Sequence, residues 1–203
     1  MSSSQPAGDT VPVGGEAPLL NIANALTCLR LLLVPVFVVA LFTGGGEDTV
    51  WRLIAFAIFV VAALTDRLDG QLARSRGLVT WFGALVDPIA DKALTGAALI
   101  GLSLLGLLPW WVTIVIVVRE LGITVLRFVV IRRGVIPASR GGKAKTVAQT
   151  VAISLFLFPL PLLLPDLLVA VLVLQWAVMA VALVLTVLTG ADYVRKAVRP
   201  QAS

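Results

Sequence analysis

Four aspartates between residues 66 and 91 are the side chains of this sequence best suited to chemistry. Asp66 and Asp69 are three residues apart, and Asp87 and Asp91 are four apart, so each pair would share one face of a helix. A carboxylate inside a membrane helix costs at least about 2.5 kcal/mol on insertion scales, so four together need compensation. A bound cation supplies it, and four oxygen donors suit two Mg²⁺ or Mn²⁺ ions.

The rest of the composition limits which side chains could bind a metal or act as a base. The chain has one cysteine, Cys28, and no histidine, which excludes a disulfide within the chain, a zinc site built from imidazole or thiolates, and any histidine base. Any metal must therefore be held by oxygen. The net charge is +5, but the basic residues stand mainly at the ends of apolar runs, as in membrane proteins, so we expect no nucleic-acid partner.

The elements that must position the acids are membrane helices. Of the 203 residues, 59% are hydrophobic and 13% are charged, and apolar runs of about 20 residues, long enough to cross a bilayer, recur along the chain. We predict an all-α, polytopic membrane protein with six transmembrane helices, at 22–43, 50–74, 82–107, 109–132, 145–164 and 167–194. We expect a disordered cytosolic tail over 1–20, one catalytic domain over 21–197, and a C-terminal tail over 198–203.

The distribution of Lys and Arg predicts the orientation. The connections are basic on one side of the membrane (74–80, 132–145 and the C-terminal tail) and contain no Lys or Arg on the other (44–49, 107–109 and 161–166). The positive-inside rule then places both termini and the acids on the cytosolic side of a bacterial-type inner membrane. Trp110 and Trp111 would belong to an interfacial aromatic belt.

The acids belong to a longer pattern, D-x2-D-G-x2-A-R-x8-G-x3-D-x3-D, over residues 66–91. This pattern resembles the signature of the CDP-alcohol phosphotransferases at every fixed position. Its small residues, Gly70, Ala73 and Gly83, leave bare backbone where a nucleotide diphosphate could approach, although close helix packing is the alternative reading. The alternative for the acids is a structural network with bases such as Arg67 or Lys92.

The resemblance implies a role for each residue of the signature. Asp66, Asp69 and Asp87 would be metal ligands, and Asp91 would be both a ligand and the general base for the acceptor hydroxyl. The residues implied to bind the CDP-lipid are Asn24, Thr27, Arg30, Gly70, Ala73, Arg74 and Gly83. For Asn24, Thr27 and Arg30, the alternative is an interfacial cap with a snorkelling arginine. A homodimer is implied by the resemblance alone.

Four further segments resemble the phosphatidylglycerophosphate synthase branch of that family. They are 21–30 (NIANALTCLR), 82–92 (FGALVDPIADK), 119–127 (RELGITVLR) and 142–149 (GKAKTVAQ). This branch implies CDP-diacylglycerol as the donor and glycerol 3-phosphate as the acceptor. Inositol-phosphate, serine and cardiolipin synthases remain alternatives with the same metal site. A divalent-cation transporter ranks far behind them, because the outer halves of the predicted spans lack a polar path.

Basic residues in the second half of the chain could bind the phosphate of the acceptor. Arg119 and Arg127 are eight residues apart, so they return to nearly the same face of an otherwise apolar span. An intramembrane arginine needs a partner or a wet cavity. Glu120 could be that partner structurally, whereas the two arginines together with Lys143 and Lys145 could form a phosphate pocket.

Overall fold

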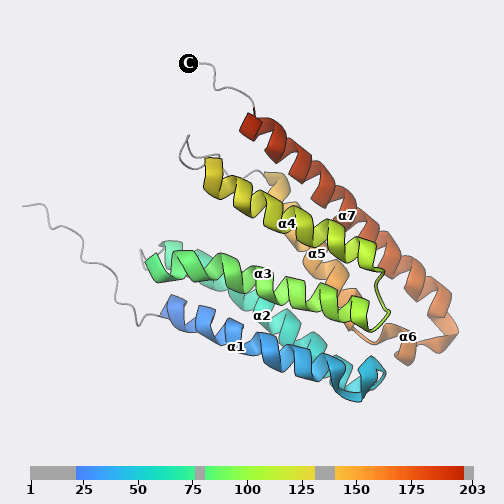
Figure 1. Cartoon of the computed structure of the whole chain (residues 1–203). Helices are drawn as coiled ribbons and strands as arrows, with labels where there is room; N and C mark the ends of the chain where they lie inside the picture. The colour runs from blue at the N-terminus through green and yellow to red at the C-terminus, as the bar shows by residue number, and fades with distance from the viewer. Residues whose placement is uncertain (1–21, 76–80, 131–139, 199–203) are drawn as a thin grey trace, which may run out of the picture.

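A computed structural model describes residues 22–75, 81–130 and 140–198 of the protein, and its side chains over 26–65, 89–90, 92–126 and 142–197. Every element in these ranges is helical, as predicted (Figure 1). The six long helices are α1 (Ile22–Phe42), α2 (Thr49–Ser75), α3 (Trp81–Leu104), α4 (Trp110–Val130), α5 (Arg140–Leu157) and α7 (Leu168–Val198). Three short elements join them: η1 (Thr43–Gly46), α6 (Leu160–Leu163) and η3 (Pro165–Leu167).

The long helices run up and down in one bundle (Figure 1). At one end, which we call the signature end, α2 finishes and α3 starts, so the two signature-bearing segments meet there. The opposite end, which we call the turn end, holds η1, the turn between α3 and α4, and α6. Helix α1 packs against α2 and α3, while α7 packs against α4 and α5. The bundle therefore consists of two groups of three helices.

The core between these groups is apolar and continuous. Phe37 and Phe59 stack at a tilt of 46° with ring centroids 6.0 Å apart, joining α1 to α2. Leu99 and Ile116 bring α3 and α4 into the same buried cluster, which Met179 of α7 completes. One buried polar link crosses it, because the hydroxyls of Ser103 and Thr113 lie 2.7 Å apart.

The outer surface of the bundle is also apolar. Leucine and valine side chains stand exposed along the helices, among them Leu32 on α1, Val118 on α4 and Val173 on α7. Contiguous apolar surface of this kind is typical of a protein that contacts lipid. By length and composition, two helical stretches in the described residues are able to cross a membrane, Leu26–Gly46 and Pro165–Ala197, and shorter apolar helices cover Thr49–Thr65 and Lys92–Leu104.

Five of the six predicted helices are confirmed to within four residues at either end. The fifth differs, because the predicted span 145–164 is divided: α5 begins five residues earlier and ends at Leu157, and α6 follows separately. The prediction treated 140–145 as a connection because it is basic, yet it forms the first turns of α5. The predicted tail over 1–20 lies outside the described residues, as does all of the C-terminal tail except Val198.

Proline explains where α5 ends. Pro159 has no N–H to donate to the carbonyl oxygen of Leu155, four residues earlier. That oxygen instead accepts a hydrogen bond of 2.8 Å from Nε2 of Gln175, on α7. The next carbonyl oxygen, that of Phe156, accepts from Nη2 of Arg52, on α2. Side chains of two other helices thus donate hydrogen bonds to the backbone carbonyl oxygens that have lost their partners within α5.

Three consecutive glycines make the turn between α1 and α2. Gly44, Gly45 and Gly46 have φ angles of 70°, 66° and 79°, a region that other residues enter only at a cost of roughly 1–2 kcal/mol. A Cβ on Gly46 would lie 2.6 Å from Cδ1 of Leu105, whereas a Cβ on Gly45 would meet nothing within 4 Å.

Gly46→Ala should therefore lower the thermal unfolding temperature in detergent more than Gly45→Ala does. Both variants carry the positive-φ strain, but only Gly46→Ala also overpacks against Leu105, which typically adds about 1–3 kcal/mol. Equal losses in the two variants would show that Leu105 moves aside without cost.

Candidate active site

A polar cavity lies among α1, α2, α3, α4 and α5. Its volume of about 70 Å³ exceeds the roughly 10–15 Å³ that one water molecule needs. Phe59, Leu99 and Ile116 form part of its apolar wall. The polar side chains that line it are those of Arg30, Lys92, Thr95, Glu120, Lys145, Thr146, Gln149 and Thr150.

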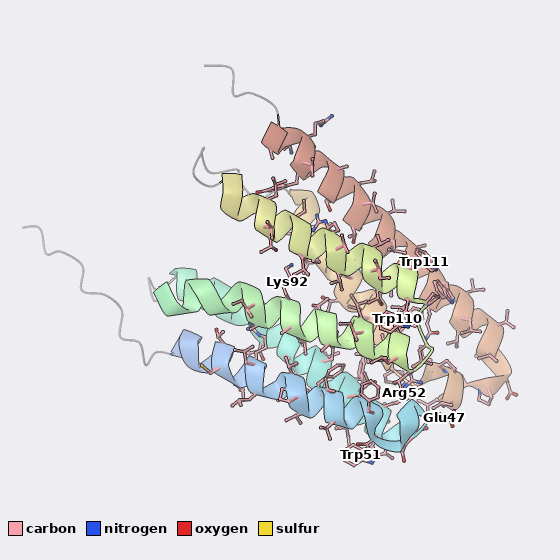
Figure 2. The ribbon with its side chains drawn as sticks, viewed as in Figure 1. Glu47, Trp51, Arg52, Lys92, Trp110 and Trp111 are labelled. Carbon is pink, nitrogen blue, oxygen red and sulfur yellow. The ribbon has the colours of Figure 1, made fainter. Side chains whose placement is uncertain are left out.

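Glu120, on α4, is the centre of an ion cluster at this cavity. Its Oε1 accepts hydrogen bonds from Nζ of Lys145 and from Nη1 of Arg119, the latter at 3.0 Å. Its Oε2 accepts from Nζ of Lys92, and Figure 2 shows Lys92 on the side of α3 that faces α4. Glu120 is only 7% exposed and Lys145 only 5%. One carboxylate therefore ties α3, α4 and α5 together.

The described side chains that line the cavity carry more positive than negative charge. Among its described lining residues, Arg30, Lys92 and Lys145 are cationic, and Glu120 is the anion. Arg30 is buried at 3% exposure, so its charge is poorly screened by solvent. Two positive charges are thus in excess in these residues, which favours an anionic ligand.

Arg119 does not line this cavity, although we predicted that it binds the acceptor phosphate. Its Nε donates to the carbonyl oxygen of Thr186 at 3.1 Å, and its Nη2 donates to Oγ1 of Thr189 at 2.8 Å. Together with the bond from Nη1 to Glu120, these contacts use all three nitrogens of the guanidinium. Its side chain also passes Gly190, where an added Cβ would lie 3.1 Å from Nε. Arg119 therefore fastens α4 to α7.

The four signature aspartates lie on the helices that border the cavity. Asp66 and Asp69 belong to α2, and Asp87 and Asp91 belong to α3. Their side chains lie outside the described ones, and so do those of Asn24, Ala73, Arg74 and Arg127. Gly70 belongs to α2 and Gly83 to α3. Among the side chains that are described, no group of three or more His, Cys, Asp or Glu could hold a metal ion.

The helical register nevertheless brings the signature close to the cavity. Ala62 lines the cavity one turn before Asp66 on α2. Lys92, which directly follows Asp91, and Thr95, one turn after Asp91, line it from α3.

The other predicted binding residues are distributed unequally. Arg30 and Lys145 line the cavity. Thr27 is buried on α1 without being part of the lining, and Lys143 is exposed near the start of α5. The predicted acceptor set therefore contributes Lys145 to the cavity itself.

Sequence reasoning missed two residues of this site. Lys92 was considered as a structural partner of the aspartates and as part of a family segment, and Gln149 only as part of a family segment. Lys92 in fact bonds to Glu120, and Nε2 of Gln149 donates to Oγ1 of Thr186 at 2.9 Å. A signal for Gln149 was present in the sequence, because an amide four residues after Lys145 in an apolar helix lies on the same face as that lysine.

A comparison with protein families matches residues 20–188 to the CDP-alcohol phosphatidyltransferase model. The chain belongs to this family. Relatives in the family include a protein of Mycobacterium tuberculosis (strain H37Rv) named as a probable phosphatidylglycerophosphate synthase. It is 59% identical over 197 residues, which cover 97% of this chain and 90% of the relative.

Two more distant relatives of the family are named CDP-diacylglycerol–glycerol-3-phosphate 3-phosphatidyltransferase. The protein of Bacillus subtilis (strain 168) is 39% identical, over 88% of this chain and 95% of its own length. The protein of Escherichia coli (strain K12) is also 39% identical, over 68% of this chain and 77% of its own length.

Glu120→Gln should destabilise the protein strongly, because it leaves Lys92, Lys145 and Arg119 without their common carboxylate. Breaking a buried ion network in this way typically costs about 3–5 kcal/mol. Thermal unfolding in detergent measures the effect. The matched control is Asp192→Asn, since Asp192 likewise holds two cations, Arg195 and Lys196, but at the surface. A similar loss in both variants would contradict a special role for the buried cluster.

Proposed function

We propose that the protein transfers the phosphatidyl group of CDP-diacylglycerol to glycerol 3-phosphate, giving phosphatidylglycerophosphate and CMP. The observation that carries this proposal is the cavity beside the two signature-bearing helices, whose described lining residues carry more positive than negative charge. The names of the relatives support the same substrates. In this reaction, an oxygen of the acceptor attacks the β-phosphorus of the donor, the phosphoanhydride bond breaks, and CMP leaves with the bonding electrons.

Asp66, Asp69, Asp87 and Asp91 would hold two divalent ions. The donor set fits Mg²⁺ or Mn²⁺, because carboxylate oxygens are the hard ligands that these ions prefer and the chain has no histidine. When bound, the ions neutralise charge at the pyrophosphate of the donor. Asp91 accepts the proton of the acceptor hydroxyl as the new P–O bond forms. Gly70, Ala73, Arg74 and Gly83, with Asn24 and Thr27, would line the path of the CDP-lipid.

The cations of the cavity would hold the acceptor. The phosphate of glycerol 3-phosphate is a dianion, which matches the two excess positive charges among the described lining residues. Lys145 and Lys92 would contact it directly. Arg30, which we predicted to bind the CDP-lipid, would add its charge from the same cavity lining. Arg119 would act through Glu120, whereas Arg127 and Lys143 would guide the acceptor toward the cavity.

We also propose that all six long helices span the membrane, with both termini and the signature end in the cytosol. The charge asymmetry of the connections supports this orientation. The exposed apolar surface supports a membrane location. Helices α2 to α5 carry polar residues because they border the cavity, and these residues weaken their hydropathy signal. A homodimer stays a prediction of the family resemblance.

The first test of this function is an assay of the purified protein with labelled CDP-diacylglycerol. Glycerol 3-phosphate should give phosphatidylglycerophosphate and CMP faster than inositol phosphate, serine or phosphatidylglycerol gives any product. A chelator should abolish turnover, and Mg²⁺ or Mn²⁺ should restore it. Preference for another acceptor would place the protein in another branch of the family. Turnover after rigorous metal removal would exclude the two-metal mechanism.

A matched pair of aspartate variants completes this assay. Asp91→Asn should lower kcat strongly while changing the KM for CDP-diacylglycerol less, because it removes the proton acceptor and keeps the shape. Asp166→Asn, at the exposed turn end, should leave kcat unchanged. Near-normal turnover of Asp91→Asn would remove Asp91 from the role of base.

Lys145→Ala should raise the KM for glycerol 3-phosphate by roughly 10- to 150-fold, the usual effect of losing one charge-assisted phosphate contact. Lys143→Ala should raise it less, because Lys143 is exposed and does not line the cavity. Steady-state kinetics at saturating CDP-diacylglycerol measures both values, with the exposed Lys196→Ala as the control. Equal effects of Lys145→Ala and Lys196→Ala would exclude the cavity as the acceptor site.

The orientation can be tested by cysteine labelling in intact cells, in a Cys28→Ser background. Asp166→Cys, at the turn end, should react with a membrane-impermeant maleimide. Lys196→Cys, near the end of α7, should react only after the cells are opened. The opposite pattern would invert the proposed topology.

A further inference from the structure

A second cavity lies at the turn end, far along the bundle from the signature. Its volume is about 560 Å³, within the range of roughly 300–1,000 Å³ that small-molecule sites occupy. Residues from η1, α2, α5, α6 and α7 line it, together with residues of the turn between α3 and α4. Its polar lining comprises Arg52, Glu47 and Gln175, and its apolar lining includes Leu105, Leu162 and Trp176.

Arg52 is the unusual residue of this turn-end cavity. It is 4% exposed, and its Nη2 donates to the carbonyl oxygen of Phe156 at 2.5 Å. Its Nε is buried without a hydrogen-bond partner. Within the described part of the chain, no carboxylate forms a salt bridge with it. A buried guanidinium without a counter-charge is unfavourable, so an anion at this position would be bound favourably.

The surroundings of the cavity indicate the kind of anion. Trp51, Trp110 and Trp111 are exposed and lie at the same end of the bundle as Arg52 (Figure 2). Tryptophans gather at the depth of lipid headgroups, so this end of the bundle lies where phospholipid phosphates lie. The apolar wall would contact the glycerol backbone and upper acyl chains of such a lipid, whereas a free inorganic phosphate gains nothing from that wall.

We propose that the turn-end cavity binds the phosphodiester of an anionic phospholipid, with Arg52 as its cationic anchor. Gln175, the other buried polar residue of the lining, uses its Nε2 for the carbonyl oxygen of Leu155 and helps to hold the broken end of α5 in place. Glu47 stands exposed at the same cavity and opposes an anion there. This repulsion favours a singly charged phosphodiester over a phosphate dianion. The site is separate from the proposed reaction and does not rest on it.

The test is lipid retention by the full-length protein, taken from bilayers of mixed phosphatidylglycerol and phosphatidylcholine and analysed by native mass spectrometry. The wild type should retain phosphatidylglycerol preferentially. Arg52→Gln should lower the ratio of retained phosphatidylglycerol to phosphatidylcholine by roughly tenfold or more, the effect of losing a charge-assisted phosphate contact. Arg195→Gln, an exposed arginine at the signature end, is the matched control and should leave the ratio unchanged.

Two further variants separate lipid binding from a purely structural role. Glu47→Gln should raise the ratio, because it removes the opposing charge without touching Arg52. Arg52→Lys should give an intermediate ratio, because it keeps the charge but loses the planar fork. Unchanged ratios in Arg52→Gln and Glu47→Gln would overturn the proposal and leave Arg52 as a cap for α5. A lower ratio in Glu47→Gln would overturn the preference for an anionic lipid.

A last experiment distinguishes binding of the whole lipid from binding of a phosphate group alone. Phosphatidylglycerol added to detergent-solubilised protein should raise the thermal unfolding temperature of the wild type and not that of Arg52→Gln. Inorganic phosphate should produce no Arg52-dependent rise. An equal rise with inorganic phosphate would overturn the lipid as the ligand.

Discussion

The buried carboxylate of Glu120 is the contact on which the inner part of this bundle depends. It is the common acceptor for cations from α3, α4 and α5, and those cations would otherwise repel one another across a poorly solvated space. Among the described residues that line the polar cavity, positive charges outnumber negative ones. The contact that ties the helices together and the proposed anion site are therefore made from one set of side chains.

The position of α7 follows from the same cluster. Arg119 reaches from Glu120 to the carbonyl of Thr186 and the hydroxyl of Thr189, and Gln149 of α5 reaches the hydroxyl of Thr186. In an apolar solvent these few hydrogen bonds, together with close packing at Gly190, specify how the last helix docks, because lipid-facing leucines and valines carry little directional information. The polar residues of the bundle are thus concentrated at the contacts that fix how one helix is positioned along another.

Much of this arrangement could be predicted from the sequence. Apolar runs bounded by glycine, proline and charge predicted the helices, and the spacing of Asp66 to Asp91 predicted the family. The end of α5 was predicted less well, because the effect of Pro159 on the helix depends on donors for the released carbonyl oxygens, and Gln175 supplies one from a distant part of the chain. Arg119 illustrates the same limit, since its spacing indicated a polar role but its partners Thr186 and Thr189 are defined only by the fold.

The division of the bundle into two groups of three helices has a thermodynamic consequence. The polar cavity lies at the seam between α1, α2 and α3 on one side and α4, α5 and α7 on the other, and the bond from Lys92 to Glu120 crosses that seam. An anion that draws Lys92 away from Glu120 would weaken the contact between the two groups. By linkage, the same free energy that the contact loses is the free energy by which the contact opposes binding of the anion. Binding of an anion through Lys92 and separation of the two helix groups are therefore reciprocally linked, since the seam between the groups holds the proposed binding site.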